Sequence, residues 1–206
     1  MKQVQHFLDY AATQEPAVTT YRASDMVLAI HSNAGYLSEE GARSRAGGHH
    51  FLSKNVANPS NNGAIYNEAS IIKSVMSSAT EAKIGALYIN ARKGVKEHNI
   101  LEEMAHTQPP TPIQTDNLTA DGIINLCVQP KRTKAMDMRF HWLRDWGVNQ
   151  KQFRFYWRPG TLMRADYWTK HHPPSHHRHM RSEILTPYKV VMDLREKMEK
   201  ITNPFK

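Results

Sequence analysis

The chain has one cysteine, Cys127, in 206 residues. A single cysteine excludes an intramolecular disulfide and any zinc site built from several cysteines. No apolar run approaches the roughly 20 residues needed to cross a bilayer, and the N-terminal stretch lacks the continuous apolar core of a signal peptide. Together these features predict an intracellular protein in a reducing compartment.

Acidic residues are also in short supply. The sequence has 19 Asp and Glu against 27 Lys and Arg, which gives a net charge of +8 and a pI near 9.6. A basic surface favours polyanionic partners, of which nucleic acid is the commonest. The alternative is a basic protein without such a partner. The hydrophobic content of 40% indicates a globular chain with one ordinary core.

The hydrophobic periodicity changes along the chain from strands to helices. Strands are predicted at 26–32, 46–53, 63–66, 113–115 and 152–157, and helices at 71–104, 117–126, 133–147 and 162–170. Strands followed by helices and a returning strand indicate an α/β or α+β sheet of about five strands.

The two ends of the chain have a different character. Residues 1–25 hold a short apolar helix pattern that ends at Pro16. Residues 171–206 begin with a His- and Pro-rich stretch, "HHPPSHHRH", which we interpret as an exposed linker in preference to a metal site. The stretch "YKVVMDLREKMEKI" then predicts an amphipathic C-terminal helix.

Three acids occupy notable places in the predicted elements. Glu81 lies on the apolar stripe of a helix, Asp116 ends a strand, and Asp166 lies on the last predicted helix of the central segment. Each also has a simpler interpretation: a first-turn acid for Glu81, a helix N-cap for Asp116 and a solvated acid for Asp166. Carboxylates without clustered Cys or His suit Mg²⁺, and two such ions about 4 Å apart promote phosphodiester hydrolysis.

Several motifs occur in an order that resembles one family. They are "SNAGYLSEEGARSRAGGHHFLS", "SSATEAKIGAL", "IQTDNLTA", "KRTKAMDMRFHWLRD" and "YWRPGTLMRADYWTK". In order and spacing they resemble the ribonuclease H domain of copia-type retrotransposon polyproteins, over about residues 26–170. The resemblance implies a ribonuclease H-like α/β fold, a five-stranded mixed sheet flanked by helices. It also implies cleavage of RNA in RNA–DNA hybrids with Mg²⁺ or Mn²⁺, and makes residues 1–25 the end of a reverse transcriptase connection.

Carried onto this chain, the family's four acidic positions are Asn33, Glu81, Asp116 and Asp166. The resemblance makes these the catalytic positions, with Glu81, Asp116 and Asp166 as metal ligands. Asn33 is an amide where the family has aspartate, and it offers one carbonyl oxygen and no charge. The resemblance therefore predicts a weakened nuclease in which Asn33→Asp restores cleavage.

Other functions remain open at this stage. One is a non-catalytic nucleic-acid-binding remnant of a retrotransposon polyprotein, and another is an interaction module that uses the C-terminal helix. A different nuclease or an integrase with the same fold is a third.

Basic and aromatic residues alternate in "KRTKAMDMRFHWLRDW". This pattern suits phosphate contact and base stacking, and we expect contacts to an RNA–DNA hybrid from Arg132, Lys134, Arg139 and Arg144. The alternative is an ordinary amphipathic helix with its aromatic residues in the core. We expect both to hold, with Phe140 and Leu143 inside.

Overall fold

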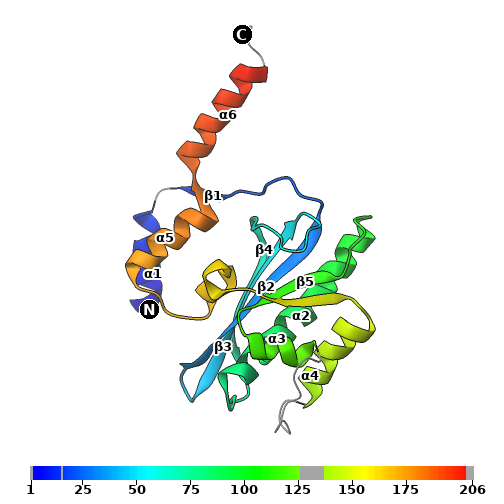
Figure 1. Ribbon diagram of the computed structural model, residues 1–206. Helices are drawn as coiled ribbons and strands as arrows, with labels where there is room; N and C mark the ends of the chain where they lie inside the picture. Colours follow the sequence, from blue (N-terminus) through cyan, green and yellow to red (C-terminus); the bar gives the residue numbers. More distant parts are fainter. Residues whose placement is uncertain (1, 15, 126–136, 203–206) are drawn as a thin grey trace. The chain divides into compact units, whose positions relative to one another are not determined.

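A computed structural model describes residues 2–14, 16–125 and 137–202 (Figure 1). Most of the helices and strands lie in the central part of the chain. These are β2 (Val27–Glu39), β3 (Arg43–Ser53), β4 (Ala64–Ile72), α2 (Ala79–Glu103), β5 (Thr111–Thr115), α3 (Leu118–Ile124), α4 (Asp137–Arg144), a π-helical turn η1 (Asp145–Asn149), β6 (Phe153–Trp157) and the 3₁₀ turns η2 (Gly160–Leu162) and η3 (Arg164–Trp168).

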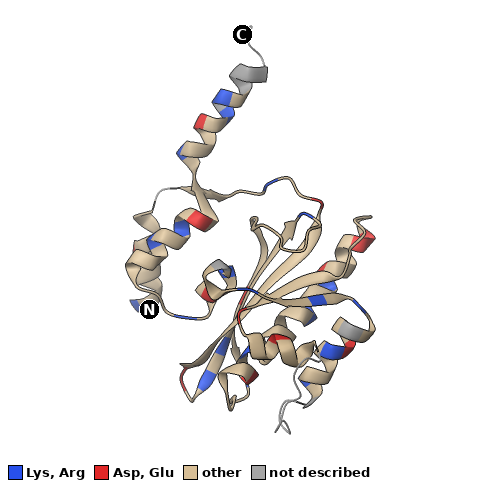
Figure 2. Ribbon diagram, in the orientation of Figure 1, with Lys and Arg blue, Asp and Glu red and all other residues tan. Residues whose placement is uncertain are grey.

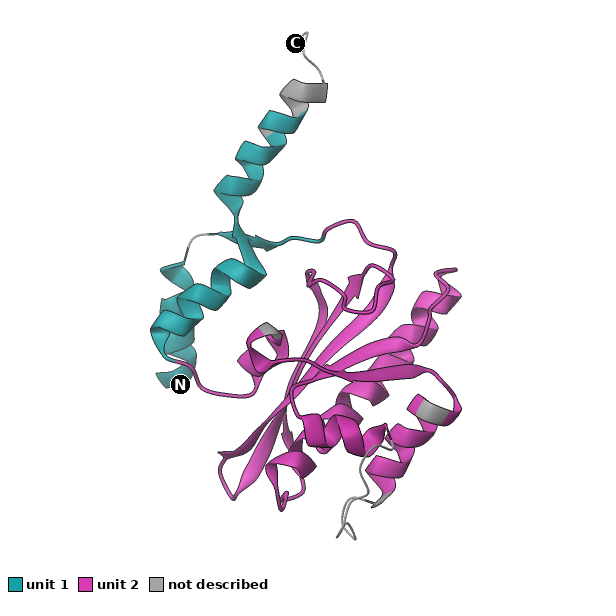
Figure 3. Ribbon diagram, in the orientation of Figure 1, with its two compact units in different colours: residues 1–21, 173–206 teal, residues 22–172 magenta. Residues whose placement is uncertain are grey.

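The chain divides into two compact units (Figure 3). The larger one spans Arg22–His172 and contains all the elements above. The smaller one is formed by the two ends of the chain, Met1–Tyr21 and Pro173–Lys206. It consists of α1 (Lys2–Ala12), β1 (Ala17–Thr19), α5 (Pro174–Ile184), β7 (Leu185–Pro187) and α6 (Tyr188–Thr202), and β1 pairs with β7 in an antiparallel ladder.

The larger unit is built on a five-stranded mixed sheet in the order β4-β3-β2-β5-β6. Strands β2, β3 and β4 pair antiparallel, whereas β5 pairs parallel with both β2 and β6. The parallel pairing of β2 with β5 requires a crossover connection, and α2 supplies it. Helices α2, α3 and α4 flank the sheet (Figure 1). The predicted five-stranded mixed sheet flanked by helices is confirmed.

The main core lies between the sheet and its helices. It joins apolar side chains of β2, α2, β5, α3, α4 and β6, including Ile30, Leu87, Ile113, Leu143 and Phe153. Apolar residues alternate along β2, where Leu28 and Ile30 face α2, because successive strand residues point to opposite faces. The other face of β2 and β3 packs against η3, where the absence of a side chain at Gly47 leaves room for the backbone of Ala165.

Three stretches differ from the prediction. Residues 162–170, predicted as a helix, form only short 3₁₀ turns, η2 and η3. Strand β4 continues to Ile72, although its sequence starts to look helical at residue 71. Residues 174–184, interpreted as part of a linker, form α5, which starts with Pro174 in its first turn, where the missing N–H of proline has no helical partner to lose.

Within the described part of the chain, no helix combines the length and apolar character needed to cross a membrane.

Candidate functional site

Asn33 and Asp116 meet where β2 and β5 separate. The parallel register pairs Ile30 with Ile113 and His31 with Gln114. Two residues further along, the same register places Asp116 beside Asn33. The ladder between the two strands has ended by then, so side chains at this edge can be reached from the neighbouring elements. The sheet thus brings together two residues that are far apart in the sequence.

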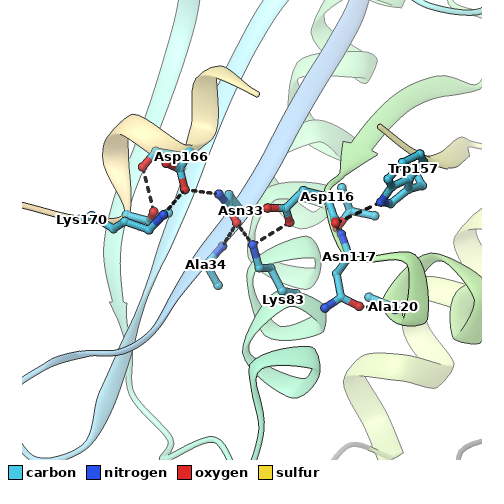
Figure 4. A network of polar contacts seen from close by, with 11 residues as sticks. Asn33, Ala34, Lys83, Asp116, Asn117, Ala120, Trp157, Asp166 and Lys170 are labelled. Atoms are coloured by element: carbon cyan, nitrogen blue, oxygen red, sulfur yellow. Dashed lines mark hydrogen bonds and ion pairs between the residues drawn. The ribbon is translucent and has the colours of Figure 1, made fainter. Parts of the chain in front are cut away.

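The carboxylate of Asp116 is not used to cap the following helix. The N-cap of α3 is Asn117, whose Oδ1 accepts from the Ala120 N–H at 2.7 Å. The simpler interpretation of Asp116 as an N-cap is therefore wrong by one residue. The backbone carbonyl of Asp116 accepts from the indole Nε1 of Trp157 at 3.0 Å, which ties the end of β5 to the end of β6 and leaves the Asp116 side chain to face Asn33 (Figure 4).

Asp166 reaches the same edge from η3. Its Oδ1 accepts from Asn33 Nδ2 at 2.8 Å and from Lys170 Nζ at 2.7 Å. The segment lies close to the sheet because Gly47 of β3, which is paired with Asn33 of β2, has no side chain. A Cβ at Gly47 would come within 2.5 Å of the Ala165 carbonyl oxygen. Three of the four predicted positions, Asn33, Asp116 and Asp166, therefore share one polar network.

Lys83, from the first turns of α2, also belongs to this network. Its Nζ donates to Asn33 Oδ1 and to Asp116 Oδ1, the latter at 2.6 Å. The Lys83 side chain is 14% exposed and that of Asp116 21%. Figure 4 shows the ammonium between the two residues it joins. Lys83 thus binds both residues at the end of the parallel strand pair.

Glu81 does not join this network. Its Oε2 accepts from the backbone N–H of Ser77 at 2.6 Å and from the Ser77 hydroxyl at 2.5 Å, while the N-cap Ser78 accepts from the Glu81 N–H. This is a variant of the capping box. Glu81 lies two positions before Lys83, and helix residues two apart do not share a face. Glu81 lies in the first turn of α2, as its simpler interpretation has it, and its convergence with the other three positions stays a prediction.

Lys83 could have been singled out from the helix periodicity. Lys83, Leu87 and Asn90 stand at i, i+4 and i+7, the spacing of one helix face. Leu87 belongs to the core, and Asn90 donates to Ser32 of β2 at 2.9 Å. The face that carries Lys83 is therefore the one that packs on the sheet.

The donor set of this network does not fit two divalent ions. Asp116 and Asp166 contribute two negative charges, and Lys83 and Lys170 contribute two positive ones. Mg²⁺ is usually held by one or two carboxylates together with several waters, but here each of the two carboxylates is already paired with a lysine. A divalent ion about 4 Å from an ammonium is repelled by about 8 kcal/mol at an effective dielectric of about 20. Among the described residues, no group of three or more His, Cys, Asp or Glu side chains could hold a metal.

Distant likenesses exist among solved structures. An RNase H1 isolated from compost by a metagenomic approach has a TM-score of 0.49 at 14% identity, covering 70% of this chain and 93% of its own. The N-terminal RNase H domain of a Mycobacterium tuberculosis protein has a TM-score of 0.47 at 13% identity, with 69% and 95% covered. The protease-reverse transcriptase of prototype foamy virus has a TM-score of 0.37 at 14% identity, with 72% and 19% covered.

No protein-family model and no curated protein matches the sequence. Likenesses as distant as these do not show what the chain does.

Two histidines are buried on the face of the sheet that packs against η3. His31 and His49 are paired across β2 and β3 and are 2% and 4% exposed. Desolvation lowers the pKa of His31 to about 3, helped by the nearby His49, Arg158 and Arg164. Desolvation also lowers the pKa of His49 to about 4. The His31 Nδ1 accepts from the Arg164 N–H at 3.3 Å, so a neutral His31 helps to hold the segment that carries Asp166.

The predicted nucleic-acid contacts lie partly outside the described residues, since Arg132 and Lys134 fall in 126–136. Arg139 donates to the Ser74 hydroxyl at 2.9 Å, and its guanidinium lies over the Tyr88 ring. Arg144 lies over the Phe140 ring at 4.9 Å. Both arginines are partly exposed on α4.

The aromatic residues of this stretch are used within the protein. Phe140 and Leu143 are buried, as predicted. Trp142 and Trp146 stack on each other at 5.0 Å and pack against the core. In the described part of the stretch, the aromatic rings therefore contribute to the core, while Arg139 and Arg144 stay partly exposed.

Proposed function

We propose that this chain is a nucleic-acid-binding domain, derived from a copia-type retrotransposon polyprotein, that binds RNA–DNA hybrids without cleaving them. One observation carries the proposal. The two carboxylates left at the centre, Asp116 and Asp166, are each within hydrogen-bonding distance of a lysine of the chain itself, at 2.6 Å and 2.7 Å. A centre of this kind lacks the carboxylates that hydrolysis by two metal ions requires.

Charge supports the binding half of the proposal. The chain carries a net charge of +8, and Figure 2 shows Lys and Arg on β3 and α4 of the larger unit. These include Arg43, Arg45, Arg139 and Arg144, although Arg45 is paired with Glu39 at 2.6 Å. Cations of this kind bind the phosphate backbone, and the A-like shape of a hybrid is recognised through its backbone and 2′-hydroxyls.

The second candidate is a weakened metal-dependent endonuclease that cleaves hybrids during reverse transcription. The convergence of Asn33, Asp116 and Asp166 at one edge of the sheet favours it. It is less well supported, because Glu81 is engaged by Ser77 and Lys83 approaches the same oxygens that would bind a metal.

One experiment separates the two candidates. A fluorescent RNA–DNA hybrid is mixed with the full chain in Mg²⁺ or Mn²⁺, and anisotropy and RNA cleavage are followed in the same sample. We expect binding that weakens steeply with salt and an RNA strand that stays intact. RNA cleavage by the unmodified protein would favour the endonuclease, and absence of salt-sensitive binding would contradict both.

A further inference from the structure

The hydrogen bonds of Lys83 suggest a specific role for it. An ammonium group has three donors and no acceptor. Two of the donors of Lys83 point to Asn33 Oδ1 on β2 and to Asp116 Oδ1 directly after β5. Lys83 itself comes from α2. One cation thus joins three elements that are separate in the sequence, which is what a divalent ion does when it bridges oxygen ligands.

Asn33 and Lys83 complement each other. The Asn33 amide is 1% exposed, and its two ends have different partners. Its Oδ1 accepts from Lys83 and from the Ala34 N–H, and its Nδ2 donates to Asp166 at 2.8 Å. An amide can accept from a cation and donate to a carboxylate at once, whereas a carboxylate can only accept. The neutral Asn33 and the Lys83 cation are therefore complementary parts of one network.

We infer that Lys83 is a built-in cation that replaces the divalent ions of this centre, so that the domain assembles its polar network and binds hybrid without metal. The inference about hybrid rests on the proposed function. The inference about the network does not, because it concerns only the contacts of Asn33, Lys83, Asp116 and Asp166 within the protein. It also explains how position 33 can hold a neutral amide at this edge of the sheet, because the Lys83 charge is still paired with the Asp116 carboxylate.

The first test uses the unmodified chain and Mn²⁺ alone. Paramagnetic Mn²⁺ broadens NMR signals of nearby groups, and the side-chain NH₂ of Asn33 lies inside the network. We expect this signal to stay sharp at Mn²⁺ concentrations up to tenfold above the protein, and the melting temperature to be the same in Mg²⁺ and in EDTA. Selective broadening of the Asn33 signal at an equimolar amount of Mn²⁺ would overturn the inference.

The second test converts the centre. Calorimetric titration with Mn²⁺ compares the unmodified chain with Asn33→Asp, Lys83→Glu and the double variant that carries both. We expect a gain in Mn²⁺ affinity of at least tenfold only where Lys83 is replaced, and the largest in the double variant. A matched control combines Asn33→Asp with Lys170→Glu, which makes the same change in charge at the more exposed lysine beside Asp166.

Because Lys83 remains in place in the control, the control should gain no Mn²⁺ affinity. An equal gain in the control and in the Lys83 double variant would mean that overall charge decides, and would overturn the inference. If the double variant does not fold, the Mn²⁺ result on the unmodified chain still decides.

A third measurement separates this inference from the proposed function. Hybrid binding is measured in Mg²⁺ and in EDTA at equal ionic strength. Equal affinity supports the inference, and binding that requires Mg²⁺ overturns it while leaving a nucleic-acid-binding domain. If no hybrid binds under either condition, the proposed function fails, and the Mn²⁺ measurements still decide whether Lys83 is the cation of the centre.

Discussion

Asn33 and Asp166 are joined by a hydrogen bond in which the Asn33 Nδ2 donates to the Asp166 Oδ1 at 2.8 Å. The bond connects β2 with η3, 133 residues apart. A carboxylate at position 33 could accept from Lys83 but could not donate to Asp166. Because Asn33 is buried, two carboxylates facing each other there would be only weakly screened by water. The amide is the side chain that this contact requires.

We therefore expect Asn33→Asp alone to leave hybrid cleavage absent and to lower the free energy of unfolding by about 1–3 kcal/mol, the usual cost of an unsatisfied buried polar contact. Urea denaturation at pH 7 and the hybrid cleavage assay measure the two effects. This expectation reverses the one from sequence alone, in which the same change restores cleavage.

A surface pair provides the control. Asn149 Nδ2 donates to Asp145 Oδ1 at 3.0 Å in an exposed position, and Asn149→Asp should cost under about 0.5 kcal/mol, as is usual for surface substitutions. Mg²⁺-dependent cleavage by the Asn33→Asp chain would contradict the prediction.

Gly47 and Gly48 are adjacent on β3 and face opposite sides of the sheet. A Cβ at Gly47 would lie 2.5 Å from the Ala165 carbonyl oxygen, whereas one at Gly48 would lie 1.9 Å from Asn90 Oδ1 on α2. Both contacts are too close for any side chain. We expect Gly47→Ala and Gly48→Ala each to lower the free energy of unfolding by about 1–3 kcal/mol, the range for overpacking.

The two variants should differ in where the structure loosens. Hydrogen exchange should speed up in residues 163–170 for Gly47→Ala, because that backbone must move away from the sheet and take Asp166 with it. For Gly48→Ala, exchange should speed up around Asn90 in α2 instead. Similar exchange patterns in both variants would show that Gly47 does not position the segment that carries Asp166.

The fold was predictable because its signals are local and repeated. Alternation along β2 and β3, the period of α2 and the breakers between them are all readable from neighbouring residues. The ends of elements that depend on tertiary contacts were harder to predict. Residues 162–170 pack against Gly47 and form 3₁₀ turns, although their sequence suggests a continuous helix.

The site was predictable at its strand ends and not on its helix. Asn33 and Asp116 follow apolar strands, and their meeting follows from the parallel register. On α2, the predicted Glu81 and the observed Lys83 lie two residues apart and differ by about 200° around the helix. An acid at Glu81 was the expected ligand, yet the residue that faces the sheet is Lys83. Identifying Lys83 required knowing which face of α2 packs on the sheet, because the type of residue alone pointed to Glu81.

His31 and His49 should make the larger unit sensitive to acid. The pKa of each is lowered in the folded protein, to about 3 and about 4, from an ordinary value of 6.5. Below pH 6.5 the unfolded chain takes up protons that the folded chain does not, so stability falls with falling pH until the folded histidines also protonate, near pH 3–4. At pH 5 each histidine should cost about 2 kcal/mol relative to neutral pH.

Urea denaturation between pH 7.5 and pH 4.5 measures this loss. His31→Gln keeps a polar side chain that does not titrate, so the variant should lose less stability between pH 7 and pH 5 than the unmodified chain does. His6→Gln, an exposed position on α1, is the control and should leave the pH dependence unchanged. Equal pH dependence in all three proteins would contradict burial of a neutral His31.

Arg139 and Arg144 should contribute to hybrid binding by neutralising phosphates. Both guanidinium groups are held by neighbouring side chains, Arg139 by Ser74 and Arg144 by the Phe140 ring, so little side-chain freedom remains to be lost on binding. We expect Arg139→Ala and Arg144→Ala each to weaken binding. Each should also reduce the slope of log affinity against log salt by about 0.9 for every phosphate that the variant no longer neutralises.

The control for this prediction removes the same charge elsewhere. Arg154, on β6, donates to the Ala57 carbonyl oxygen at 2.8 Å and lies over the Tyr156 ring, and Arg154→Ala should leave the salt slope unchanged. Thermal denaturation of all three variants checks that the weaker binding does not come from unfolding. If the three variants weaken binding equally, net charge alone draws the hybrid to the protein. A specific contact surface on α4 requires Arg139→Ala and Arg144→Ala to weaken binding more than Arg154→Ala does.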